Sequence, residues 1–185
     1  MSQSYPMADL GERIVAKDIF FEFTKLVRRY LEAKELLKKG SFLDSLYRVH
    51  QSLHHSARLA VLEVGEEPDL LLWEQVKEID SSVYKLYEEL ITSREALDKR
   101  IELFLLALEF SISSKLDHSV EFLLMLMKTR KEPWTINEIV NHPSINDPTV
   151  ELAFILEKMV NRSLLKLKTR ERQGILETGY SYFYF

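Results

Sequence analysis

The chain has 185 residues, which is enough for one domain or two small ones, and its net charge is −4. Apolar residues make up 46% and charged residues 29%, which is typical of a folded protein and excludes a disordered one. The absence of cysteine excludes disulfide bonds, thiolate metal sites and a thiol nucleophile. The first ten residues lack the features of a secretion signal, and residues 101–110, the longest apolar-rich run, are too few to span a membrane. We therefore expect a cytoplasmic protein that does not insert into a membrane.

Apolar residues spaced by three and four predict helices throughout the first 116 residues. The first helix contains Phe20 to Leu37 and ends at Gly40. Ser41 is expected to cap a second, strongly amphipathic helix that ends at Gly65. Further helices are expected at residues 69–79, 82–91 and 93–113. Because residues 101–112 are apolar in nearly every direction, we expect the fifth helix to be covered on all sides.

The remaining residues follow a different pattern. A helix is expected from Leu116 to Arg130, and Thr135 with Glu138 forms a capping box that opens a short second helix. A third helix is expected from Asp147-Pro148 to about Asn161. The period then changes from 3.6 to 2, which predicts strands at residues 165–169 and 180–185. The fold class is therefore mainly α, with a helical bundle at residues 1–115 and a winged helix-turn-helix with a two-stranded β-hairpin at 116–185.

Positive charge is concentrated near the end of the chain. Residues 1–116 contain 16 Lys and Arg against 20 Asp and Glu, whereas residues 117–185 contain nine of each. Six of the latter cations lie within residues 158–172, beside one acid, and form a candidate nucleic-acid-binding surface: Lys158, Arg162, Lys166, Lys168, Arg170 and Arg172. Alternation along a strand directs Lys166, Lys168 and Arg170 to one face, where they could contact backbone phosphates. The third helix begins with one hydroxyl and one acid, so we expect binding without sequence preference; contact with a protein is the equally weighted alternative.

A polar stripe lies on the second predicted helix, beside its apolar face. Its members are Tyr47, His50, His54 and Arg58, which share one sector of the helix. We interpret them as a ligand-facing stripe for an anionic or nucleotide-like ligand, with a structural role at the edge of the core as the alternative. His50 and His54 are also half of a metal site, but no third ligand is evident. The sequence contains no cofactor-binding motif, so we expect neither a cofactor nor a bound metal.

The segments Phe23–Tyr30, Ser52–Val61, Trp73–Lys77 and Tyr84–Leu90, in this order, resemble the C-terminal part of a family of bacterial nucleotidyltransferase-like proteins. The resemblance covers about residues 12–185. It implies a helical substrate-binding-like domain followed by a helix-turn-helix, without the nucleotidyltransferase-like domain and its metal-binding carboxylates. The chain is then a fragment of a longer protein or a naturally short relative.

The resemblance predicts a non-catalytic substrate- and nucleic-acid-binding segment. It would bind nucleic acid through the β-hairpin, which is the wing of the winged helix-turn-helix, and would associate with a nucleotidyltransferase-like domain in cis or in trans. One alternative is a transcriptional regulator in which the bundle senses a ligand and the winged helix binds DNA. A second alternative is a ribonuclease similar to the helical HEPN family, because Arg48 is followed by His54 and His55 as in the R-x(4–6)-H motif of that family. The chain alone is not expected to be an enzyme under the first hypothesis.

Overall fold

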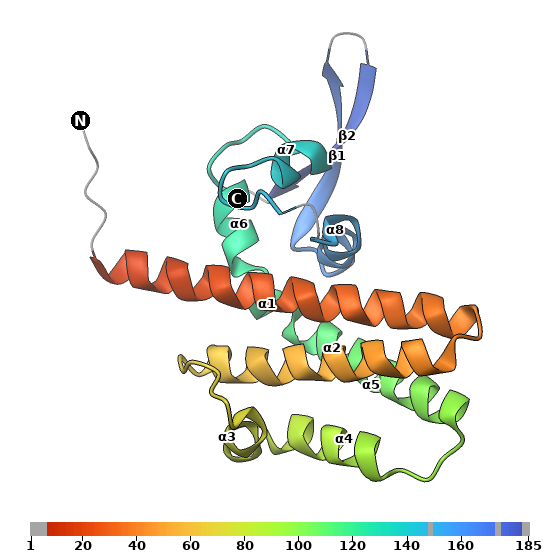
Figure 1. Cartoon of the computed structure of the whole chain (residues 1–185). Helices are drawn as coiled ribbons and strands as arrows, with labels where there is room; N and C mark the ends of the chain where they lie inside the picture. The colour runs from red at the N-terminus through yellow and green to blue at the C-terminus, as the bar shows by residue number, and fades with distance from the viewer. Residues whose placement is uncertain (1–6, 148–149, 173–174, 183–185) are drawn as a thin grey trace. The chain divides into compact units, whose positions relative to one another are not determined.

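The computed structural model describes residues 7–147, 150–172 and 175–182; side chains at 7–10, 170–172, 175–177 and 182 lie outside this description. The chain divides into two compact units, Met1–Ser114 and Lys115–Phe185. Figure 1 shows the elements, which are α1 (Met7–Lys38), α2 (Phe42–Glu63), α3 (Leu72–Ile79), α4 (Ser81–Thr92), α5 (Leu97–Ser119), α6 (Glu121–Met127), α7 (Ile136–Val140), α8 (Leu152–Asn161), β1 (Leu165–Arg172) and β2 (Ile175–Tyr182). The predicted fold class, a mainly helical chain that ends in a helix-turn-helix with a β-hairpin, is confirmed.

The first unit is built on the antiparallel pair α1 and α2, which lie side by side in Figure 1. Gly40 ends α1 with φ +74°, a left-handed conformation that favours glycine, and its N–H donates to the carbonyl of Leu37 at 2.9 Å. Phe20, Phe23 and Val27, which belong to the apolar stripe of α1, are fully buried. The periodicity of the sequence therefore predicts the buried face of α1 correctly.

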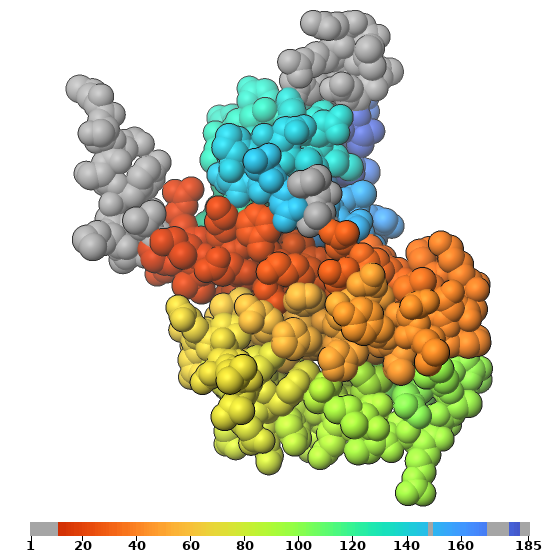
Figure 2. Space-filling model, in the orientation of Figure 1, coloured from red at the N-terminus to blue at the C-terminus, as the bar shows by residue number. Residues whose placement is uncertain are grey.

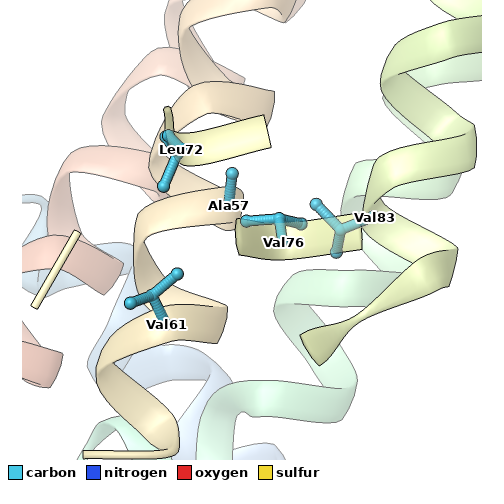
Figure 3. Close-up of a cluster of buried hydrophobic side chains, with 5 residues drawn as sticks. All are labelled: Ala57, Val61, Leu72, Val76 and Val83. Carbon is cyan, nitrogen blue, oxygen red and sulfur yellow. The ribbon is translucent and has the colours of Figure 1, made fainter. Parts of the chain in front are cut away.

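Helices α3 and α4 cover another side of α2 through a small apolar cluster. Figure 3 shows its members, which are Ala57, Val61, Leu72, Val76 and Val83. Asp80 holds the start of α4, because its Oδ1 accepts hydrogen bonds from the backbone N–H groups of Ser82 at 3.1 Å and Val83 at 3.2 Å. The short helices are therefore anchored at a defined position along α2.

Helix α5 is joined to α1 by the buried Tyr30, whose Oη donates to Glu109 Oε2 at 2.7 Å. Burial of the phenol and the neighbouring carboxylate raise the pKa of Tyr30 well above its usual range. The expectation that this helix is covered on all sides is wrong: Leu103, Leu106 and Phe110 are 57%, 67% and 77% exposed. One buried side is enough to hold a helix, so apolar residues on its other side do not require a cover.

The second unit has the arrangement of a winged helix-turn-helix. Helices α6, α7 and α8 bury an apolar core that includes Leu123, Ile139 and Ile155. β1 and β2 form an antiparallel hairpin, and Trp134 extends it by pairing with Tyr180 through two backbone hydrogen bonds of 2.8 and 2.9 Å. The capping box is present, with Thr135 N–H donating to Glu138 Oε2 at 2.9 Å and Glu138 N–H donating to Thr135 Oγ1 at 3.3 Å.

Two predicted helix boundaries in the second half of the chain are wrong. The helix expected from Leu116 to Arg130 is divided at Val120 between α5 and α6. The third helix begins at Leu152 and not at Asp147-Pro148, because the preceding loop turns at a left-handed Asn146 (φ 37°) and buries Val150; Pro148 itself lies outside the described residues.

Ser41 precedes α2 as expected, but its side chain makes no capping hydrogen bond. Within the described residues, no helix is both long and apolar enough to cross a membrane.

Candidate functional site

Helix α2 lies between α1 on one side and α4 on the other (Figure 1), and the predicted polar stripe lies on its outer face, away from its buried residues. Tyr47, His50 and His54 are exposed, and the side chain of Arg58 is 37% exposed. Figure 2 shows that atoms of α1, α2 and α4 form one continuous surface on this side of the bundle. The outer face of α2 is therefore accessible to a ligand.

His50 is directed towards α4. Its ring centroid lies 5.5 Å from that of Tyr87, and its Nε2 is 3.3 Å from the Tyr87 hydroxyl oxygen. Tyr87 is in turn stacked on Trp73 of α3, with centroids 3.6 Å apart and planes inclined by 6°. We call these three residues the aromatic ladder. Nucleobases stack on partly exposed aromatic rings of this kind.

Arg58 is directed towards α1, where it binds a buried carboxylate. Glu22 is 3% exposed, and its Oε1 accepts from Arg58 Nε at 3.0 Å and from His55 Nδ1 at 2.8 Å. Lys25 Nζ donates to the other oxygen at 3.1 Å. Burial alone raises the pKa of Glu22, but the hydrogen bond from His55 and the charges of Lys25, His55 and Arg58 outweigh it and lower the pKa to about 2. Glu22 is thus an ionised buried anchor that fixes three side chains.

A second carboxylate on α1 organises a second group of cations. Glu32 accepts from Arg28 Nε at 3.0 Å and from Arg29 Nη1 at 2.8 Å, and Arg48 Nε of α2 lies 3.1 Å from its Oε2. Burial raises the pKa of Glu32, but its hydrogen bonds with Arg29 and Arg28 lower the pKa by more, so the net shift is downward. Arg48 is additionally held by Gln51 Oε1 at 2.7 Å.

The structure thus divides the predicted stripe between two neighbouring helices. His50 joins aromatic residues, Arg58 joins α1, and Tyr47 accepts a hydrogen bond from Gln51 Nε2 at 3.1 Å. His54 remains between them; desolvation first, then the nearby His55 and Arg58, lower its pKa, which keeps the imidazole neutral at pH 7.

Neither a metal site nor the HEPN-like pair has geometric support at the histidines. Across the described ranges, no three His, Asp or Glu side chains are grouped so that they could hold a metal ion. Arg48 and His55 bind different carboxylates, Glu32 and Glu22, so they do not converge on one point as a catalytic couple would.

The predicted nucleic-acid-binding cations lie at the C-terminal end of α8 and on β1. Lys158 Nζ is 5.3 Å from the ring centroid of Phe154, and Arg162 follows the last residue of α8 and is exposed. On β1, Lys166 is partly buried and Lys168 is exposed, opposite Ser181 and Gly179 of β2. The side chains of Arg170 and Arg172 lie outside the described residues.

Helix α8, which would read base edges in a winged helix, presents few groups suited to that task. Its exposed residues are Ala153, Glu157 and Asn161. An alanine offers no hydrogen bond and a glutamate repels phosphate, so only Asn161 resembles a base-reading side chain. This surface agrees with the expectation of binding without sequence preference.

Sequence reasoning did not find Glu22, Trp73 or Tyr87 as parts of the site. Glu22 carried a signal, since it is a lone acid beside the apolar stripe of α1. Trp73 and Tyr87 lie in segments that carry the family resemblance, but their stacking depends on the packing of α3 against α4 and leaves no spacing signature.

Two segments of the chain match two different protein families. Residues 16–115 match the family described as YgxA-like substrate binding domain. The chain belongs to the YgxA-like substrate-binding domain family. Residues 121–182 of this YgxA-like chain match a family described as helix-turn-helix domain. A relative from Bacillus subtilis (strain 168), named "Uncharacterized protein YgxA", is 37% identical over 166 residues, which are 89% of this chain and 56% of the relative.

A solved structure shares the fold of this chain. The crystal structure of a nucleotidyltransferase-like protein from Exiguobacterium sibiricum 255-15 is 32% identical, with a TM-score of 0.82 over 92% of the YgxA-like chain and 60% of the solved chain. The chain thus spans a little under two thirds of the length of each of these two proteins.

Proposed function

We propose that the chain is a non-catalytic part of a nucleotidyltransferase-like protein and binds that protein's substrate and nucleic acid. The observation that carries the proposal is that a YgxA-like substrate-binding domain is followed by a helix-turn-helix domain, and that most of the chain matches a solved nucleotidyltransferase-like protein. The carboxylates of Glu22 and Glu32 are engaged by cations, so they serve to position side chains rather than to ligate a metal.

In this proposal the helix-turn-helix domain contacts nucleic acid through the wing. Lys166 and Lys168 occupy the same face of β1, where phosphate groups of a duplex can approach them, and Arg162 extends this surface from α8. The exposed face of α8 favours general binding over the operator recognition required by a transcriptional regulator. The outer face of α2, with Tyr47, His50, His54 and Arg58, is the substrate surface.

Nucleic-acid binding by the wing is tested by fluorescence anisotropy. Two 20-base-pair DNA duplexes of unrelated sequence are titrated with the full chain at several salt concentrations. We expect similar affinities for both duplexes, each falling steeply with salt. The double variant Lys166→Glu and Lys168→Glu should weaken binding of both duplexes by about tenfold or more, because each reversal replaces a phosphate contact with repulsion.

The matched control is Lys85→Glu with Lys99→Glu, which changes the charge equally at exposed positions of α4 and α5. Equal weakening by both double variants would mean that net charge alone is responsible. Strong preference for one duplex would favour the regulator hypothesis, and no binding by the folded chain at low salt would refute the proposal.

A further inference from the structure

Positive charge gathers where α1 packs against α2, although the first 116 residues are acidic overall. Five cations of α1 and α2 pair with two carboxylates of α1 in this region, and we call them the cation seam: Lys25, Arg28, Arg29, Arg48 and Arg58. They share the two carboxylates Glu22 and Glu32, which leaves three positive charges in excess. The same residues 1–116 carry four more acids than bases, so the excess is a local feature.

The carboxylates fix the seam and occupy only part of its hydrogen-bonding capacity. Arg28, Arg48 and Arg58 each use Nε towards a carboxylate. A guanidinium has five N–H donors in a rigid fork, so the terminal nitrogens have donors beyond those that the carboxylates accept. Side chains held in this way lose little further entropy when they bind a phosphate.

The seam extends along α1 over a distance that suits a polymeric anion. Glu22 and Glu32 are ten positions apart on one helix, which is about 15 Å at the rise of an α-helix. Two separated groups of cations favour an extended polyanion over a single phosphate group.

The opposite border of the same face is aromatic. Trp73, Tyr87 and His50 form the aromatic ladder on the α4 side of α2, whereas Arg48 and Arg58 turn to the α1 side. Only the outer surface of α2, with Tyr47 and His54, separates the two borders. A cationic track beside stacking aromatic rings is the combination that binds single-stranded nucleic acid.

We propose that the outer face of α2 binds single-stranded nucleic acid, with backbone phosphates on the cation seam and bases against the aromatic ladder. This inference deepens the proposed function, since it assigns a substrate class to the substrate surface and gives the chain a nucleic-acid-binding site on the bundle in addition to the one proposed on the wing. A duplex fits less well, because its base faces are stacked on one another and cannot reach Trp73, Tyr87 or His50.

The experiment uses the full chain with Lys166→Glu and Lys168→Glu, which removes the wing contribution, and a fluorescein-labelled 12-nucleotide RNA of mixed sequence. Fluorescence anisotropy should show salt-dependent binding to the single strand and weaker binding to a duplex of the same sequence. Adding Arg48→Gln and Arg58→Gln should raise Kd about tenfold or more and reduce the slope of log K against log salt by about 1.4, or about 0.7 for each phosphate contact.

Four further variants distinguish a binding defect from a folding defect, and phosphate contacts from base contacts. Arg48→Lys with Arg58→Lys keeps the charge and should retain part of the affinity, while Lys85→Gln with Lys99→Gln is the matched control and should leave Kd unchanged. His50→Ala should weaken binding several-fold, since it removes a stacking surface. With Trp134→Phe, Trp73 is the remaining tryptophan, and the RNA but not inorganic polyphosphate should quench it.

Unchanged RNA binding by the folded Arg48→Gln, Arg58→Gln variant would overturn the inference, and so would equal affinity for the duplex or equal quenching by polyphosphate. If the wing substitutions alone abolish RNA binding, the inference fails and the wing proposal stands. If the bundle binds RNA while the unmodified chain ignores the duplexes used to test the wing, the wing proposal fails and the inference stands.

Discussion

The bundle and the wing both present cations to solvent, but they hold them by different means. On the bundle, Glu22 and Glu32 lie beneath the cation seam and each binds three positively charged or proton-donating side chains. On the wing, Lys166 and Lys168 share a face because side chains alternate along a β-strand. An organised seam can distinguish ligands by shape, whereas alternating lysines supply charge with little geometric selection.

This difference also explains why the net charge of each half of the chain does not predict where its cations gather. The bundle is the more acidic half of the chain, yet five of its cations surround only two carboxylates, Glu22 and Glu32, which position them. The wing needs no such scaffold, and its charge is visible in the sequence.

The largest effect is expected when the buried carboxylate that positions part of the cation seam, Glu22, is removed. Glu22→Gln should destabilise the bundle by about 2–3 kcal/mol, because the positive charges around this buried position lose their ion-pair partner. The loss is limited because the side chains of Lys25 and Arg58 are partly exposed to solvent. Urea denaturation followed by circular dichroism measures the change. Glu35→Gln, which breaks only an exposed pair with Lys38, is the control and should have no measurable effect. Equal stability of the two variants would mean that Glu22 does not anchor the seam.

The same anchor should make the stability of the bundle depend on acid. The pKa of Glu22 is lowered from 4.5 to about 2, so its contribution is fully present above the unfolded pKa and is lost as pH falls through the folded one. The difference in unfolding free energy between the wild type and Glu22→Gln should be greatest above about pH 5 and should shrink steadily towards pH 2. A difference that is independent of pH over this interval would contradict an ionised Glu22.

The wing should depend on close backbone packing where the bundle depends on charge. A Cβ added at Gly179 would lie 2.5 Å from Cβ of Pro133, so Gly179→Ala should destabilise the second unit by about 2 kcal/mol. Gly11→Ala is the matched control, because nothing lies within 4 Å of its added Cβ and it lies in α1; it should stabilise by about 0.5–1 kcal/mol. Thermal unfolding measures both, and a neutral Gly179→Ala would show that the strand can move away from Pro133.

The smallest effect is expected for a single cation of the wing. Lys168 is exposed, so Lys168→Gln should change the unfolding free energy by less than about 0.5 kcal/mol. It should reduce the slope of log K against log salt for duplex DNA by about 0.9, the value of one phosphate contact. Anisotropy titrations at several salt concentrations test this, and an unchanged slope would exclude Lys168 from the contact.

Much of the fold could be predicted because its signals are local. Gly40 and Gly65 mark helix ends, Thr135 and Glu138 form the predicted capping box, and the change of period before Leu165 marks the hairpin. The start of α8 was not predictable in this way, since the loop before it is set by the burial of Val150 rather than by the Asp-Pro pair. The exposure of Phe110 was missed because an apolar pattern cannot say how many sides of a helix are covered.

The candidate site could be predicted only in part. The stripe on α2 follows from helix geometry, and its members do lie on the outer face. Their partners, Glu22 on α1 and Tyr87 on α4, depend on how three helices are rotated against one another, which no spacing within α2 encodes. The site roles of these residues remain predictions for the experiments above.

The two glycines that flank α2 have a consequence for length variation. Gly40 and Gly65 take left-handed conformations before and after this helix, so its first and last turns are fixed. One residue inserted between Arg48 and His55 would rotate everything beyond it by about 100°, which would swing Arg58 away from Glu22. The same insertion between Gly65 and Leu72 would leave that phase intact, so relatives of this chain should tolerate gaps in the second place and not in the first.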